Sequence, residues 1–108
     1  MNVLETRFGA GVVLALSGRL DGFSAPALEL QTTRLISEGV KRIVFDCSGL
    51  EYVSSAALRV FLVTAKHLQS AGGLCSFAAL SGETREIFGL CGFLELLEVH
   101  DTVADACS

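Results

Sequence analysis

The 108-residue sequence contains no cluster of Lys and Arg and no long hydrophobic run. Its eight basic residues are scattered, and the net charge is −4 at pH 7. Because concentrated positive charge is what binds nucleic acids and anionic membranes, neither is an expected partner. No apolar run approaches the roughly 20 residues of a membrane-spanning helix, and the N-terminus MNVLETRF lacks a signal peptide's apolar core. We therefore expect a cytoplasmic protein without membrane insertion.

Paired cysteines, clustered histidines and nucleotide-binding glycine motifs are also missing. The only histidines are His67 and His100, and no CxxC pair occurs among the four cysteines, Cys47, Cys75, Cys91 and Cys107. Metal sites need paired ligand spacing, so we expect no metal or cofactor, and the thiols are interpreted as reduced, buried small hydrophobes. His67 lies far along its predicted helix, and no obvious nucleophile accompanies His100. The inventory argues against an enzyme; a small hydrolase would require turnover that depends on His100.

Hydrophobic residues make up 51% of the sequence, and the mean hydropathy is +0.56. This apolar content is enough for the core of one compact domain spanning residues 1–108. Periodicity and turn residues predict the order ββαβαβαβ(α), an α/β fold whose mixed, mostly parallel sheet has four to five strands with helices packed on it. The predicted strands are 2–8, 12–16, 43–45, 74–80 and 96–99. The predicted helices begin after Ser24, Ser54 and Ser81, with a short closing helix capped by Asp101.

The stretch from residue 43 to residue 68 carries the strongest local pattern. An apolar strand is followed by Asp46–Gly49, whose residue types predict a turn, and then by a long amphipathic helix. Ser54 is the expected N-cap and Ser55 the first helical residue, and Val53 and Leu58 occupy the positions of a hydrophobic staple. In parallel sheets the loops after the strands gather at the carboxyl edge. We therefore expect Ser55 at that edge, with predicted loops 18–23, 46–54 and 80–82.

The chemistry of this helix start suits a binding surface. Ala56, Ala57 and Leu58 are expected to leave the first helical turn smooth and apolar, and the Ser55 hydroxyl is expected to project outward. Phosphorylation of Ser55 would add about −1.5 to −2 charges beside the partly positive helix terminus. Since an interface must desolvate that charge, one phosphate is predicted to abolish binding without a large change in the fold.

Four segments resemble those of one known family. They are Ser17–Asp21 (a G-x-L-D segment), Asp46–Leu50 (a D-x-S-x-L strand exit), Tyr52–Val60 (the helix start with two serines) and Phe88–Phe93 (an F-x-x-x-G-[LF] turn). The chain resembles a STAS domain, specifically the stand-alone bacterial anti-sigma-factor antagonists, over essentially its whole length. The helix start is the specific part of the match. Ala57 departs from the usual Gly, which is expected to add a methyl group at the partner surface.

The resemblance implies a partner-switching regulator of transcription. Such a protein binds an anti-sigma factor that is also a serine kinase and so frees the sigma factor. The kinase phosphorylates the second serine, here Ser55, and a PP2C-type phosphatase reverses the reaction. The partner-binding residues then comprise Asp21, Gly22, Ser48, Ser54, Ser55, Ala56, Ala57 and Arg59.

Other interpretations remain open from the sequence. Ser55 could be an unregulated second capping serine, and Arg59 could be solvated surface. Asp21, Asp46 and Ser48 could serve only to stabilise turns. The alternative function is a non-switching STAS subunit of a stressosome-like scaffold or a lipid-transport complex. The start at Met1 and the short length argue against a transporter tail.

Overall fold

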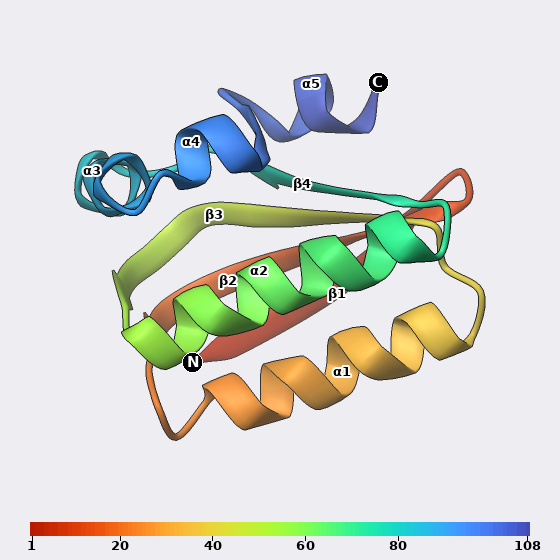
Figure 1. The fold of residues 1–108 in the computed structure, drawn as a ribbon, viewed down its shortest axis with the longest axis horizontal. Helices are drawn as coiled ribbons and strands as arrows, with labels where there is room; N and C mark the ends of the chain where they lie inside the picture. The colour runs from red at the N-terminus through yellow and green to blue at the C-terminus, as the bar shows by residue number, and fades with distance from the viewer.

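The structure, a computed structural model, describes residues 1–108 and forms one α/β unit (Figure 1). Its strands are β1 (Asn2–Phe8), β2 (Gly11–Leu20), β3 (Arg42–Val53), β4 (Leu74–Ala78) and β5 (Glu98–His100). Its helices are α1 (Ala25–Ser37), α2 (Ser55–Ser70), α3 (Gly82–Leu90), α4 (Phe93–Leu96) and α5 (Val103–Cys107). No helix combines the length and the apolar character needed to cross a membrane.

The five strands form one sheet in the order β1-β2-β3-β4-β5, so each strand pairs with its neighbours in the sequence. β1 runs antiparallel to β2, and all the other pairs are parallel. The mixed, mostly parallel sheet predicted from the sequence is therefore confirmed. Helices α1 and α2 lie side by side over one face of this sheet (Figure 1), joined by a buried hydrogen bond of 3.3 Å between the hydroxyls of Thr32 and Thr64.

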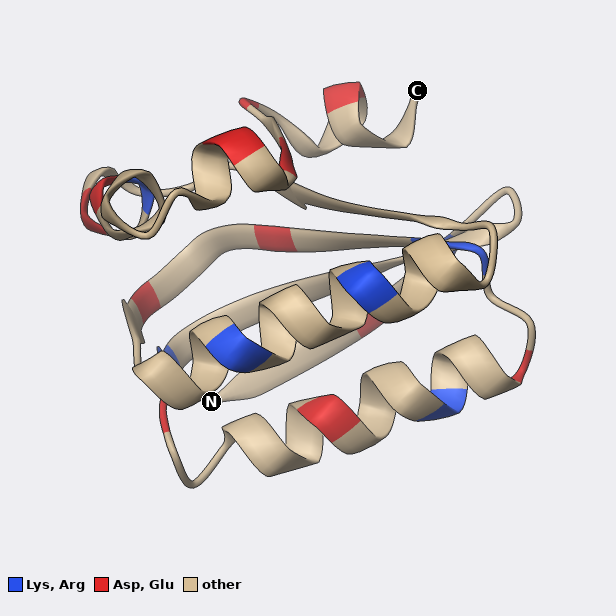
Figure 2. Ribbon diagram, in the orientation of Figure 1, with Lys and Arg blue, Asp and Glu red and all other residues tan.

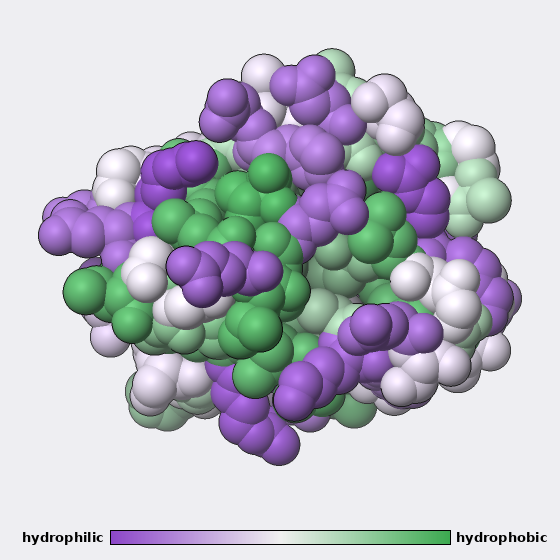
Figure 3. Space-filling view, turned by 45° about the horizontal axis from the view of Figure 1, so that its top comes forward, coloured by the Kyte–Doolittle hydropathy of each residue, from purple (hydrophilic) through white to green (hydrophobic).

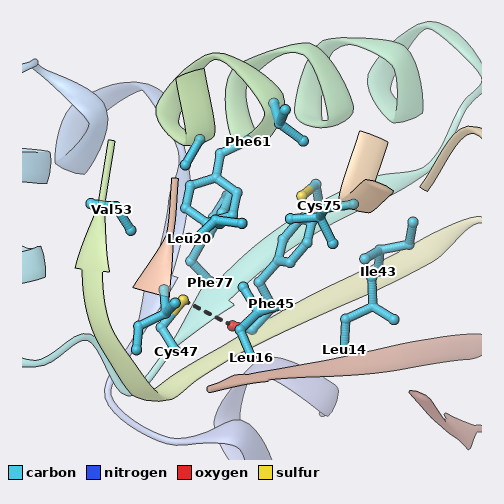
Figure 4. Packing of buried hydrophobic residues seen from close by; sticks show 14 of the residues in the cluster. Leu14, Leu16, Leu20, Ile43, Phe45, Cys47, Val53, Phe61, Cys75 and Phe77 are labelled. Carbon is cyan, nitrogen blue, oxygen red and sulfur yellow. Dashed lines mark hydrogen bonds between the residues drawn. The ribbon is translucent and has the colours of Figure 1, made fainter. Parts of the chain in front are cut away.

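The main core lies between the sheet and α1–α4 and is centred on phenylalanine rings. Phe61 of α2 packs against Phe45 of β3 and Phe77 of β4, with 5.1 Å between ring centroids in both pairs (Figure 4). Phe88 of α3 lies 5.5 Å from Phe77. All four rings are fully buried. They fix α2 against the sheet, because close-packed cores allow little displacement of a side chain.

A smaller core lies on the opposite face of the sheet, beneath α5. Val44 belongs to it, whereas its strand neighbours Ile43 and Phe45 belong to the main core, as expected from the alternation of side chains along a strand. Ala106 of α5 packs against Val44 in this smaller core. Arg42 donates hydrogen bonds to the carbonyls of Ala106 (2.7 Å) and Cys107 (3.4 Å) at the end of α5. The guanidinium therefore attaches the last helix to β3.

The predicted turn at Asp46–Gly49 is wrong, because β3 continues without interruption to Val53. The turn-forming residues are accommodated in an irregularity of the β2–β3 ladder, where Ala15 pairs with Asp46 but Ser17 pairs with Gly49. The Asp46 carboxylate accepts the N–H of Ser48 at 3.1 Å, a turn-like contact within a strand. A Cβ on Gly49 would lie 2.9 Å from the Leu16 carbonyl oxygen, so the strands approach too closely for any other residue.

Other boundaries also differ from the predictions. β2 extends to Leu20, four residues beyond its predicted end, while β4 ends two residues early. The short helix α4 was not predicted, and the last strand is shifted to Glu98–His100. Thr102, rather than Asp101, caps α5, because its hydroxyl accepts the N–H of Asp105 at 3.1 Å. By contrast, the predicted cap of α3 is confirmed, with Ser81 accepting the N–H of Thr84.

Candidate functional site

The start of α2 has the geometry predicted for the serine pair. Ser54 is the N-cap, with extended backbone, and its hydroxyl accepts the N–H of Ala57 at 3.2 Å. Ser55 is the first helical residue and is exposed, and its hydroxyl makes no hydrogen bond within the protein. One serine is therefore engaged in folding and the other presents a free hydroxyl at a helix terminus.

A tight turn between β2 and α1 lies beside this helix start. Leu20 pairs with Val53 in the β2–β3 ladder, and the N–H of Ser54 donates to the Leu20 carbonyl at 2.9 Å. The residues that follow Leu20 are consequently held next to the residues that follow Val53. The structure thus brings Asp21 and Gly22 to the same edge as Ser54 and Ser55, as the sequence predicts.

The Asp21 carboxylate organises the turn. One oxygen accepts the N–H groups of Phe23 (3.0 Å) and Ser24 (3.2 Å) and the Ser24 hydroxyl (3.1 Å). The backbone N–H groups of Ser24 and Phe23 lower the pKa of Asp21, because they stabilise the ionised form. α1 begins after Ser24, as predicted, but the Ser24 hydroxyl makes no capping hydrogen bond to the helix, because it bonds within this turn and accepts the Asp21 N–H at 2.9 Å.

Phe23 was not identified from the sequence as a site residue, yet it is the most exposed large apolar side chain, with 96% of its surface accessible. It projects from the turn that Asp21 holds in place. A single exposed apolar side chain is common on protein surfaces, so Phe23 is a candidate because of its place, on a turn held next to Ser54. The sequence does contain a signal that could have identified Phe23. It lies within Asp21–Ser24, a stretch of turn-forming residues outside the hydrophobic periodicity that marks core positions.

The three other candidates on α2 differ in their surroundings. Arg59 is exposed, lies one helical turn from Ser55 on the same face, and forms an ion pair of 3.5 Å with Glu29 of α1. Ala56 is exposed, but Ala57 is completely buried. The expectation that the Ala57 methyl group lies on the partner surface is therefore wrong, because that methyl group belongs to the core.

Ser48 does not join the other candidates. It is exposed, but it lies within β3, six residues before Ser54, which corresponds to roughly 20 Å along an extended strand. Its neighbours include Asp46 and Ala15 on the part of the sheet that α5 leaves open. The predicted loop 46–54 therefore does not exist as a single loop at the edge, and only its end approaches the candidate site.

Among the remaining reactive side chains, Cys47 and Cys75 are buried and Cys91 is exposed. No group of three or more His, Cys, Asp and Glu side chains is placed to hold a metal ion. Burial raises the pKa of the Cys47 thiol to about 12, with a further contribution from the Asp46 carboxylate, and burial also raises the pKa of Cys75. Thiols that stay protonated are poor nucleophiles. His100 bonds to Glu98 at 2.8 Å, in a pair exposed to solvent.

Similarity to known proteins extends over the whole chain. The family model of the STAS domain matches residues 3–106. The chain is 34% identical over 102 residues to a protein of Bordetella bronchiseptica named as an anti-sigma factor antagonist, BtrV, and the match covers 94% of this chain and 88% of BtrV.

Solved structures give the same result for the fold. An anti-sigma factor antagonist from Mycobacterium paratuberculosis superposes with a TM-score of 0.88 at 26% identity, covering 97% of this chain and 89% of that one. The phosphorylated form of the Bacillus cell fate determinant SpoIIAA superposes with a TM-score of 0.80 at 20% identity, covering 97% and 96%. With its sheet order, its serine-capped α2 and these matches, the chain belongs to the STAS domain family.

Proposed function

We propose that this STAS domain is an anti-sigma-factor antagonist that binds an anti-sigma serine kinase and is released when Ser55 is phosphorylated. The observation that carries the proposal is the free, exposed hydroxyl of Ser55 at the start of a rigidly held helix, immediately after a serine that caps it. Its similarity to BtrV supports the same class of activity. The protein would act by occupying its partner, and a PP2C-type phosphatase would restore binding.

The proposed partner surface is formed by the helix start and the adjacent turn. We call it the switch surface and define it as Asp21, Gly22, Phe23, Ser55, Ala56 and Arg59. Phe23 supplies an exposed apolar side chain that a partner can bury, and the pairing of Leu20 with Val53 brings its turn to the same edge of the sheet as Ser55. Because the Asp21 hydrogen bonds and the buried Phe61 already fix both segments, little conformational freedom is lost on binding.

A phosphate on Ser55 would be tolerated by the fold. The N–H groups of Ser55 and Ala56 have no partner within the helix, and a phosphate at a helix N-terminus gains about 0.3–1 kcal/mol from the helix dipole. Arg59, one turn away, adds a guanidinium on the same face. SpoIIAA, which shares this fold, is known in a phosphorylated form.

The same phosphate would oppose complex formation. Phosphorylation adds about −1.5 to −2 charges at neutral pH, and burying an unpaired charge costs several kcal/mol. Since about 1.4 kcal/mol corresponds to a tenfold change in affinity, one phosphate is sufficient to end binding. Phosphorylation of Ser55 would therefore leave the folded protein stable while it weakens the complex, as a partner switch requires.

The test measures binding and phosphorylation by the cognate anti-sigma kinase. Ser55→Ala is expected to bind like the wild type and to remain unphosphorylated by mass spectrometry, whereas Ser55→Asp is expected to bind at least tenfold more weakly. Ser48→Asp is the matched control, because it adds the same charge at another exposed serine outside the switch surface. Equal affinities of the Ala and Asp variants, with no phosphate on Ser55, would support a non-switching subunit instead.

A further inference from the structure

β1 is an edge strand of the sheet, with β2 as its single neighbour. An unpaired edge exposes a row of backbone N–H and C=O groups, and proteins usually protect it with a proline, a bulge or a covering segment. β1 has seven residues, no proline and an uninterrupted register with β2. On one face of β1, Glu5 accepts hydrogen bonds from Gln31 and Arg34 of α1. On the other face α5 packs against β3, β4 and β5 and leaves Leu4 and Thr6 of β1 exposed (Figure 1).

The hairpin between β1 and β2 determines which backbone groups of β1 point outward. Phe8 pairs with Gly11 across a two-residue turn, and the pair that closes such a turn is hydrogen-bonded. Bonded and non-bonded pairs alternate along an antiparallel ladder, so the even-numbered residues of β1 bond to β2. The N–H and C=O groups of Val3, Glu5 and Arg7 therefore point toward the free edge.

The sequence of β1 is complementary to itself when two copies are placed antiparallel about a two-fold axis at Thr6. The outward backbone groups of the two strands then face one another. Glu5 of each copy lies opposite Arg7 of the other, which gives two cross-strand pairs of opposite charge. On the opposite face Leu4 lies opposite Phe8, in the type of pair that has the shorter Cα separation. The smallest shift that keeps the backbone groups aligned would place Glu5 opposite Glu5 or Arg7 opposite Arg7, so the charges select one register.

The elements at this edge carry no net charge that would oppose a second copy. β1 and α1 contain two acidic residues, Glu5 and Glu29, and two basic residues, Arg7 and Arg34, although the whole chain carries −4. Figure 2 shows both signs of charge on α1. The Arg7 side chain is 58% exposed, and its ion pair with Glu5 of its own chain is long, at 3.6 Å. Its guanidinium is therefore accessible to the carboxylate of a second copy.

We propose that two copies of this chain pair through β1 in this register and form a symmetric dimer with one continuous sheet, to which each copy contributes its five strands. A strand-to-strand interface of this length is small, so we expect the dimer to depend on concentration. Because β2 is antiparallel to β1, the β2 strands of the two copies run in opposite directions and their switch surfaces lie at opposite ends of the dimer. No residue of the switch surface belongs to β1, so the inference is independent of the switch at Ser55.

The test measures self-association of the intact protein by sedimentation equilibrium. Arg7→Glu places like charges opposite each other in both pairs and should weaken the dimer roughly tenfold, and Glu5→Lys should do the same. An equimolar mixture of these two variants restores both pairs of opposite charge and should form a heterodimer. Lys66→Glu, the same charge change on α2, is the matched control and should leave the dimer unchanged. A wild-type protein that remains monomeric at about 1 mM, or folded variants that form no heterodimer, would overturn the proposal.

Amide hydrogen exchange in the wild-type protein locates the contact without any substitution. As the protein concentration rises, the N–H groups of Glu5 and Arg7 should exchange more slowly, because they form the new backbone hydrogen bonds. The N–H groups of Leu4 and Thr6 should change less, because they already bond to β2. Equal protection of all four groups, or protection of none, would refute the assignment.

A pair of leucine variants distinguishes β1 from the other exposed apolar area of the molecule. Figure 3, with the side bearing α3, α4 and α5 turned toward the viewer, shows an apolar area bordered by hydrophilic residues, and such areas can also mediate association. Leu96 of α4 is 71% exposed on the surface and Leu4 of β1 is 68% exposed. Leu4→Ser should weaken the dimer, because Leu4 lies opposite Phe8 of the other copy, whereas Leu96→Ser should leave it unchanged. A dimer that Leu96→Ser dissociates and Leu4→Ser does not would overturn the proposal.

Discussion

Phe23 offers the sharpest test of the switch surface, because its side chain contributes to binding without contributing to folding. With 96% of its surface exposed, Phe23 buries almost nothing in the free protein, so Phe23→Ser should leave the unfolding midpoint unchanged. Fully burying a phenylalanine in a complex contributes roughly 1.5–3 kcal/mol. We therefore expect the dissociation constant for the anti-sigma kinase to rise about 10- to 150-fold.

The dissociation constant is measured by isothermal titration calorimetry or surface plasmon resonance with the unphosphorylated protein and the kinase. A thermal unfolding scan of each variant accompanies the measurement. Leu4→Ser is the matched control, because Leu4 is 68% exposed on β1, at the other side of the sheet from α1 and α2. A change of less than twofold for Phe23→Ser would place Phe23 outside the interface. Similar losses for both variants would mean that the effect reflects surface hydrophobicity in general.

Four further measurements test the helix cap, the core packing and the thiols. Ser54→Ala removes the side-chain cap of α2 and should lower the free energy of unfolding by about 1 kcal/mol in a urea titration, whereas Ser55→Ala should not. Phe61→Ala leaves a cavity among the buried rings and should cost about 3–5 kcal/mol by the same titration; a loss below 1 kcal/mol would show that the core collapses to fill it. Because the pKa of Cys47 is raised to about 12, the native state keeps a proton that the unfolded chain loses above pH ~8.5, so stability should fall from that pH upward. Replacing Cys47 with alanine should reduce this dependence without abolishing it, because the pKa of the buried Cys75 is raised as well. In the native protein a thiol reagent should modify the exposed Cys91 first.

The sequence was sufficient for the parts of the site that depend on local chemistry. The start of α2 was predicted from Ser54 and from the staple positions Val53 and Leu58. These signals are local, because the Ser54 hydroxyl accepts an N–H only three residues along the chain. The succession of strands and helices along the chain, and with it a mostly parallel sheet, followed from the alternation of apolar patterns.

Features that depend on tertiary pairing were not predictable in this way. Asp46, Ser48 and Gly49 have turn-type side chains, but the adjacent β2 strand holds them in a ladder with an irregular register. Ala57 is in the first turn of α2, and the residues of that turn alone do not show which of them face the sheet. In the structure Ala57 is fully buried. The exposure of Phe23 likewise depends on the direction in which the turn leaves the sheet, and composition does not encode that direction.

The consecutive order of the strands has a consequence for how the protein is made. Domains begin to fold from the N-terminus during synthesis. Here each new strand adds beside the strand synthesised just before it. All residues of the switch surface, from Asp21 to Arg59, therefore emerge from the ribosome before the chain reaches β4. Phe77 and Phe88, which complete the packing around Phe61, arrive only afterwards. The surface is assembled early in synthesis and becomes rigid late.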